Sequence, residues 1–212
     1  MLPNKLTSAV FWLAVLSPLS TAAPLKSILD EGTHCVAYKA MKTMFFISSG
    51  AVIGKNCDVS AQVLPELGGL YHIEVTIPLR SFQSGDADRD LDVMKTLKAD
   101  VRPEMLFRSQ AMTAEQWHAL FGKAEFNLAG ELTIGAKSFP VKVASRYIER
   151  NDSAEVDGMT TVRFQDFALA PPSVGAGIVA KTNPEFEVHF HLLGSRILGA
   201  DSIRLAKKDD SK

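Results

Sequence analysis

The stretch from Phe126 to Tyr147 constrains the fold more than any other part of this chain. Apolar and polar side chains alternate along it, first over residues 126–134 and again over residues 139–147. Alternation with a period of two is typical of a β-strand that has one buried and one solvated face. The link between the two arms contains Gly135, which can adopt the positive φ that a tight turn requires. The stretch therefore predicts an antiparallel hairpin, and further strands must cover its apolar face.

The rest of the chain supplies these strands. Residues 71–79 and 186–192 alternate most clearly, and shorter candidates precede and follow them. Between the strands, residues 86–101 repeat apolar side chains every three to four positions, and residues 113–116 have the form of a helix capping box. About eight strands joined by short turns favour an all-β fold with one or two short helices. Closing eight antiparallel strands into a β-barrel would remove the exposed sheet edges.

The first 23 residues have the composition of an export signal. A weakly basic start precedes the apolar run 9–16, and small residues at 20–23 offer a signal peptidase site. The apolar run is too short to predict a membrane span. We therefore predict a signal peptide at 1–23, a folded domain at 24–205 and a polar tail at 206–212. The protein is expected to be periplasmic or secreted, without stable membrane insertion after signal removal.

The net charge of the chain narrows the range of expected partners. A formal net charge of -1 over 212 residues gives no electrostatic reason to expect a nucleic-acid partner.

The two cysteines, Cys35 and Cys57, both lie in the part of the chain that is expected to be exported. An even cysteine count in an exported protein favours a disulfide between them. Two buried thiols in neighbouring strands are the alternative.

The last predicted strand places His189 and His191 on one face together with Glu187. Two imidazoles at this spacing can chelate zinc or copper. Because this face is opposite Phe186 and Phe190, we predict that it is the outer, solvated side and that it holds no metal. A metal site at the two histidines stays the alternative. We predict no catalytic residue and no enzyme, because the chain has no G-x-S-x-G, H-E-x-x-H or P-loop motif.

Several segments carry the motifs of one known family. Residues 130–141 match the pattern G-D-L-T-I-x-G-x-x-x-P-V, with Glu131 in place of the aspartate. Residues 81–109 follow the pattern S-x-x-x-(R-D)…L…P…F-x-S, and Phe164-x-Asp166-Phe167 is similar to R-x-D-F-G, with Ala168 in place of the glycine. In the order and spacing of these motifs, residues 33–195 resemble the YceI-like, polyisoprenoid-binding family of exported bacterial proteins.

The resemblance implies a lipocalin-like, eight-stranded antiparallel barrel around an apolar pocket. Its expected partner is an isoprenoid or quinone-like lipid, and no other cofactor is expected. A barrel with a filled core that serves as a protein-interaction module is the alternative function, and a homodimer stays open. The apolar stripe of the 86–101 helix packs on the strands or forms a lid over the pocket. The expected lining residues are Phe45, Ile73, Val75, Ile77, Leu91, Met94, Phe107, Phe126, Phe139, Phe186 and Phe190.

Overall fold

The computed structural model describes residues 27–45, 47–150, 154–174 and 180–203. The predicted signal peptide at 1–23 and the predicted tail at 206–212 lie outside these ranges, as do both ends of the predicted domain at 24–205. Within the described ranges, no helix combines the length and apolar character needed to cross a bilayer.

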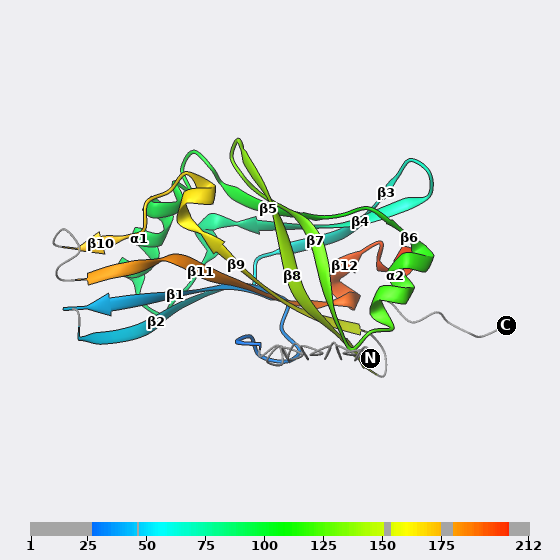
Figure 1. Cartoon of the computed structure of the whole chain (residues 1–212), viewed down its shortest axis with the longest axis horizontal. Helices are drawn as coiled ribbons and strands as arrows, with labels where there is room; N and C mark the ends of the chain where they lie inside the picture. The colour runs from blue at the N-terminus through cyan, green and yellow to red at the C-terminus, as the bar shows by residue number, and fades with distance from the viewer. Residues whose placement is uncertain (1–26, 46, 151–153, 175–179, 204–212) are drawn as a thin grey trace, which may run out of the picture.

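A single curled sheet forms the body of the molecule (Figure 1). Its ten-strand path runs β12-β3-β4-β5-β7-β8-β9-β11-β1-β2, while β6 pairs with β4 and β10 pairs with β11 beside this path. Neighbouring strands are antiparallel, except that β12 runs parallel to β3. The strands are β1 (Cys35–Met44), β2 (Ser48–Asn56), β3 (Ser60–Glu66), β4 (Leu70–Pro78), β5 (Glu104–Ser109), β6 (Met112–Thr113), β7 (Glu125–Ile134), β8 (Lys137–Glu149), β9 (Ala154–Arg163), β10 (Ser173–Val174), β11 (Ala180–Leu193) and β12 (Ile197–Leu198).

The expectation of an all-β fold is confirmed, but the expectation of eight strands in a barrel was too simple. The sheet curls into a half-barrel whose path ends at β2 and β12, and no ladder joins these two strands in the described part of the chain. One isolated bridge, between Lys55 and Gln83, connects the β2 edge to the segment after β4. The count was low partly because β6, β10 and β12 have two residues each. Two residues are too few to show a period-two pattern.

The hairpin predicted from residues 126–147 is present as β7 and β8. The two strands pair antiparallel from Glu125 with Arg146 to Ile134 with Lys137. Gly135 takes the left-handed backbone conformation in the turn, with φ +58. Buried side chains follow the expected face, so that Leu132 is fully enclosed. The hairpin lies in the middle of the sheet, where β5 pairs with β7 and β9 pairs with the second half of β8.

Both predicted helices are present, and they lie at opposite ends of the half-barrel (Figure 1). Helix α1 (Ala87–Leu97) begins at Asp86, whose side chain accepts a hydrogen bond from the Arg89 backbone N–H. Helix α2 (Ala114–Phe121) begins at the expected capping box, in which Thr113 and Gln116 satisfy each other's backbone N–H groups. The short 3₁₀-helices are η1 (Leu79–Ser81), η2 (Phe164–Phe167), η3 (Gly194–Arg196) and η4 (Ala200–Ile203).

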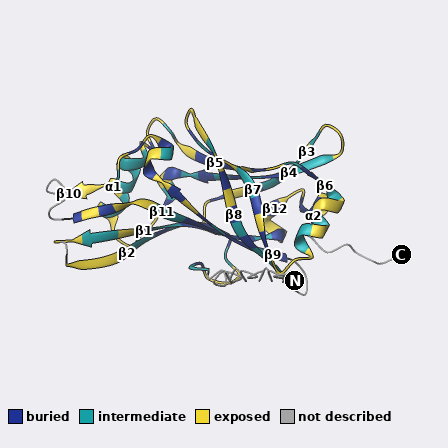
Figure 2. Cartoon of the chain, viewed as in Figure 1, coloured by how far each residue is buried: buried dark blue, intermediate teal, exposed yellow. Residues whose placement is uncertain are grey.

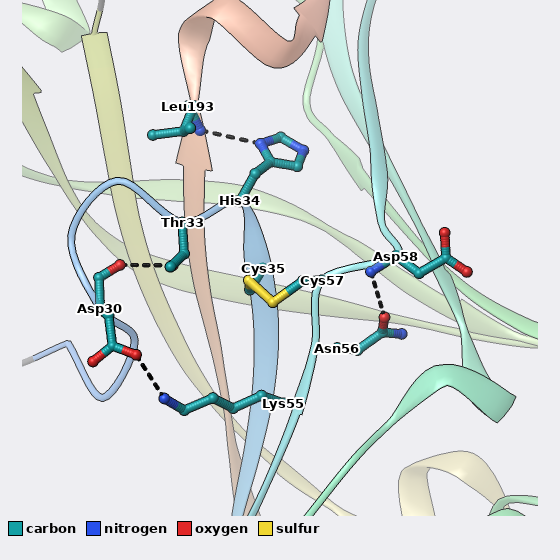
Figure 3. Close-up of a disulfide and its surroundings, with 9 residues drawn as sticks. All are labelled: Asp30, Thr33, His34, Cys35, Lys55, Asn56, Cys57, Asp58 and Leu193. Carbon is teal, nitrogen blue, oxygen red and sulfur yellow. Dashed lines mark hydrogen bonds and ion pairs between the residues drawn. A yellow bond between two sulfur atoms is a disulfide. The ribbon is translucent and has the colours of Figure 1, made fainter.

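The described N-terminal segment, residues 27–34, packs on the outside of the sheet. Its Leu29 forms a small apolar cluster with Cys35 and Ala37 of β1, separate from the main core. Cys35 forms a disulfide with Cys57, which follows β2 (Figure 3). In addition, the Asp30 carboxylate lies 2.9 Å from Lys55 Nζ. The segment is therefore attached to the sheet by apolar contacts and an ion pair beside the disulfide.

Candidate ligand cavity

A cavity of about 880 Å³ lies at the α1 end of the half-barrel. This volume falls within the range of about 300–1,000 Å³ that is typical of small-molecule sites. Strands β1, β2 and β11 contribute many of its lining residues, and η1, η2 and α1 contribute most of the others. The apolar residues that line it are Ala37, Tyr38, Ala40, Met44, Ala51, Val52, Leu79, Phe82, Val93, Leu97, Met105, Ile134, Phe164, Phe167, Pro172, Ala180, Phe186 and Val188.

An aromatic cluster forms one part of the cavity wall. The rings of Phe164 and Phe186 have centroids 4.7 Å apart, and those of Phe167 and Phe186 are 5.9 Å apart. Behind this wall, Phe139 meets Phe167 edge to face at 4.6 Å. Aromatic pairs at these distances attract one another beyond the effect of their buried area. The wall is therefore held by contacts among its own members, and it leaves space on its inner side.

Tyr38 of β1 brings one polar group into this apolar interior. Its ring lies against Gly54 of the neighbouring strand, where a Cβ atom would come within 2.4 Å of the ring. Its edge meets Phe82 at 5.4 Å between centroids. The hydroxyl oxygen is buried and has no hydrogen-bond partner among the described residues. Burial, assisted by the nearby Asp90 carboxylate, raises the pKa of Tyr38 to about 12, so that the hydroxyl keeps its proton at neutral pH.

The mouth of the cavity is charged, in contrast to its interior. Helix α1 contributes Asp88, Arg89, Asp92 and Lys95, its N-cap residue is Asp86, and β1 contributes Lys42. The two signs are nearly balanced around the opening. Such a rim keeps the entrance hydrated without favouring a strongly charged ligand.

At the α2 end, the interior is filled by side chains. Trp117 is fully buried, and its Nε1–H donates a hydrogen bond of 3.0 Å to the Tyr71 carbonyl. Phe121 stacks on Trp117 at 5.5 Å and on Tyr147 at 5.1 Å, and it meets Phe126 at 6.0 Å. The interior of the molecule is thus packed at one end and hollow at the other.

Of the eleven side chains expected to line the pocket, the structure places Phe186 at the cavity. Phe45 and Leu91 are 62 % and 48 % exposed, because Phe45 lies in the β1–β2 turn and Leu91 faces outward from α1. Met94 and Phe139 are partly buried and pack against the core. The remaining side chains point inward as expected but belong to the closed core: Ile73, Val75, Ile77, Phe107, Phe126 and Phe190.

The cavity also uses residues that the sequence did not single out. Tyr38 and Ala40 lie in β1, and Phe164 and Phe167 belong to the 3₁₀-helix η2. A signal was available for η2, because the D-F motif marks it. Alternation alone gave no signal for the depth of any side chain within the sheet.

The prediction that His189 and His191 face solvent was wrong. Both are buried, with 4 % and 1 % of their surface exposed. They do lie on the outer face of β11, but residues 27–34 and the neighbouring strands cover this face. A strand near the middle of a sheet can therefore be buried on both faces when another segment packs on its outside.

Carboxylates surround the two histidines. His191 Nδ1 lies 2.6 Å from Asp157, which also accepts a 2.5 Å hydrogen bond from Arg146. Burial raises the pKa of Asp157, but the hydrogen bonds from His191 and Arg146 outweigh it and hold the pKa below its ordinary value. His189 Nε2 lies 2.8 Å from Glu187. Within the described ranges, no group of three or more His, Cys, Asp or Glu side chains has metal-binding geometry.

The fold and the cavity together define a class of protein in which a curled, mainly antiparallel sheet surrounds a largely apolar cavity of the size of a small-molecule site. A model of the YceI-like domain matches residues 29–193. The chain therefore belongs to the YceI-like family, as its motifs indicated.

Solved structures of proteins from three bacteria have a similar fold. Burkholderia cenocepacia BcnA is 21 % identical, with a TM-score of 0.55 over 74 % of this chain and 95 % of its own. The Campylobacter jejuni YceI protein is 15 % identical, with a TM-score of 0.51 over 69 % and 86 %. A polyisoprenoid binding domain from Saccharophagus degradans, implicated in plant cell wall breakdown, is 11 % identical, with a TM-score of 0.54 over 74 % and 92 %. No curated protein matches the chain.

Proposed function

We propose that this protein binds a long apolar lipid, an isoprenoid or quinone-like molecule, in the cavity at the α1 end, and that it does so without catalysis. The observation that carries the proposal is an interior of about 880 Å³ with apolar walls in a fold that otherwise packs its core closely. Burying each CH₂ group is worth about 0.8 kcal/mol. A chain of several isoprene units therefore gains enough transfer free energy to offset the entropy lost on capture.

Two further observations support this ligand class. The Saccharophagus degradans domain with the same fold is described as polyisoprenoid binding. The Tyr38 hydroxyl is a buried donor without a partner among the described residues, in a residue that lines the cavity, and a lipid that carries an oxygen would satisfy it where a pure hydrocarbon would not. The ligand we propose is thus an apolar chain with a hydroxyl or carbonyl oxygen that reaches Tyr38.

We place this activity outside the cytoplasm, in the periplasm or in the secreted fraction. The composition of residues 1–23 supports export, and the disulfide between Cys35 and Cys57 suits an oxidising compartment. N-terminal sequencing of the protein purified from periplasmic extract would show cleavage after Ala22 or Ala23 if this assignment is right. An intact Met1 would contradict it.

Native mass spectrometry and organic extraction of the exported protein test the function directly. We expect a co-purified apolar lipid, and uptake of geranylgeraniol by protein that has been stripped of it. The Ala40→Phe variant places a ring in the cavity and should reduce uptake at least tenfold, whereas Ala119→Phe on the exposed face of α2 should not. Bare wild-type protein that takes up no isoprenoid would refute the proposal.

The same assay tests the role of Tyr38. Tyr38→Phe removes the hydroxyl and keeps the ring against Gly54. A neutral hydrogen bond contributes about 0.5–1.5 kcal/mol, so the affinity for geranylgeraniol should fall roughly 2- to 12-fold. Affinity for squalene, an isoprenoid without oxygen, should stay the same or rise. An equal change in affinity for both probes would show that Tyr38 forms no hydrogen bond with the ligand oxygen.

A further inference from the structure

The β1–β2 hairpin ends in an apolar tip that the described residues leave uncovered. Met44 is 45 % exposed, Phe45 62 % and Ile47 91 %. With Met41, these are four of the eight exposed large apolar side chains in the described part of the chain. Turns between strands normally carry Gly, Asn, Asp or Pro, whereas the sequence across this turn is Met-Phe-Phe-Ile. The composition of the tip is therefore opposite to what a solvated turn requires.

The backbone of the tip is also unusual. Phe45 adopts a left-handed conformation, with φ 49. This conformation is unfavourable for a bulky side chain, and glycine or asparagine would relieve the strain. Phe45 thus combines a strained backbone with an exposed aromatic ring. Strain of this kind is characteristic of segments that serve binding rather than folding.

The tip lies at the hollow end of the molecule. Figure 1 shows the β1–β2 turn at the same end as α1 and β10, far from α2, and Figure 2 shows that the outer half of β2 is exposed. Residues that lead into the tip also line the cavity, namely Lys42 and Met44 from β1 and Gly50 from β2. The apolar tip and the cavity mouth are therefore parts of one continuous surface.

The charges beside the tip are positive. Lys42 lies on β1, and Lys181 of β11 pairs with Thr43 across the ladder. Neither lysine forms an ion pair within the described ranges, and residues 41–51 include no acidic side chain. The acidic residues of the mouth, such as Asp88 and Asp92, belong to α1 instead. The tip thus combines exposed apolar side chains with neighbouring lysines, the composition that suits the headgroup boundary of an anionic bilayer.

We infer that the β1–β2 tip docks on a lipid bilayer and places the cavity mouth against the membrane, where the ligand enters and leaves. This inference rests on the proposed function, because it gives the lipid a route that avoids water. The side chains at 44, 45 and 47 enter the boundary between headgroups and acyl chains, while Lys42 and Lys181 contact anionic headgroups. The rest of the molecule stays outside the bilayer.

A second copy of the chain fits the tip less well than a bilayer does. Stable protein interfaces bury about 800 Å² on each partner over a broad, complementary patch. The exposed apolar side chains of the tip are instead few and belong to one short turn, at the end of a sheet in which β1 pairs with both β2 and β11. A patch this small penetrates a soft surface such as a bilayer more readily than it covers a protein face.

Flotation with vesicles of phosphatidylethanolamine and phosphatidylglycerol tests the inference. The processed protein, purified from the periplasm, should float with the vesicles. The double variant Phe45→Ser with Ile47→Ser should lower the bound fraction at least tenfold. The control is Leu67→Ser, which removes a side chain that is 96 % exposed in the β3–β4 turn at the other end of the molecule. This control should bind vesicles like the wild type.

Ligand retention separates failure of this inference from failure of the proposed function. The double variant should keep its co-purified lipid and its melting temperature while losing vesicle binding and transferring geranylgeraniol to vesicles more slowly. Unchanged flotation of the double variant, or no flotation of the wild type, would overturn docking. A wild-type dimer that the double variant converts to monomer, without vesicle binding, would assign the tip to a second copy instead. Vesicle binding by a wild type that takes up no isoprenoid would leave docking intact and refute the lipid cavity.

Discussion

At the scale of single residues, Ala168 shows how a departure from the family pattern costs stability. The family motif has glycine at this position, and here alanine takes the left-handed conformation that glycine adopts freely, with φ 55. Ala168 ends η2, and its N–H donates to the Gln165 carbonyl at 2.9 Å, so the backbone cannot relax without losing this bond. Left-handed backbone costs a non-glycine residue about 1–2 kcal/mol, whereas glycine adds about 0.4–1 kcal/mol of unfolded-state entropy.

The Ala168→Gly substitution should therefore stabilise the protein by about 0.5–1 kcal/mol, measured by urea denaturation. The matched control is Ala119→Gly on the exposed face of α2, where the backbone is helical. Glycine within a helix costs about 1 kcal/mol relative to alanine, so this control should lower the free energy of unfolding. A loss of stability in both variants would show that the backbone at 168 is not strained.

At the scale of elements, the attachment of the N-terminal segment to β11 depends on a buried neutral histidine. His34 is 2 % exposed, and its Nδ1 accepts a 3.1 Å hydrogen bond from the Leu193 N–H (Figure 3). Burial, followed by the nearby Arg196 and His191 side chains, lowers the pKa of His34 from 6.5 to about 4. An accepted hydrogen bond at Nδ1 requires that this nitrogen carry no proton.

The pKa of His34 predicts a loss of stability in mild acid. Between pH 6.5 and about 4, the unfolded chain takes up a proton that the folded protein excludes, so the free energy of unfolding falls as the pH falls. The full effect is up to about 3 kcal/mol. His34→Asn keeps an acceptor for Leu193 and should flatten the curve of unfolding free energy between pH 6.5 and 4.5. A variant with the wild-type slope would exclude His34 as the cause.

The elements also show what sequence patterns can and cannot predict. Alternation predicted the β7–β8 hairpin and the inward face of β4, because a period of two reports directly on a pleated strand. It could not show that the outer face of β11 is covered, since residues 27–34 carry no periodic signal of their own. The capping box predicted α2 because its signature is local. The position of Phe45 depends on where β1 ends and its turn begins, and alternation did not fix that boundary.

At the scale of the whole molecule, the interior is divided into two parts with different roles. The α2 end is packed around Trp117, and the α1 end is hollow beside Phe186. Inward-facing side chains occur in both halves, so the strand pattern alone gives no hint of the division. It arises because α2 inserts Trp117 into the core, whereas α1 presents partly exposed side chains to the other end and has no fully buried residue.

This division predicts that stability and ligand affinity respond to different substitutions. Trp117→Ala removes a fully buried side chain and its hydrogen bond to Tyr71, so it should cost about 3–5 kcal/mol of unfolding free energy and leave isoprenoid affinity unchanged. Phe186→Ala removes a ring with the cavity on one side, so fewer contacts are lost and the cost should be about 1–2 kcal/mol.

For isoprenoid affinity we expect the opposite ranking, in which Phe186→Ala has the larger effect and Trp117→Ala the smaller one. The reason is that the ligand would contact Phe186 and not Trp117. Isoprenoid affinity should fall at least fivefold in Phe186→Ala, and saturating geranylgeraniol should raise the melting temperature of the wild type more than that of this variant, since stabilisation by a ligand follows its affinity for the folded state. Thermal melts with and without ligand measure both effects. If Trp117→Ala weakened binding as much as Phe186→Ala did, the packed end would be part of the site, and the two halves of the molecule would act as one unit.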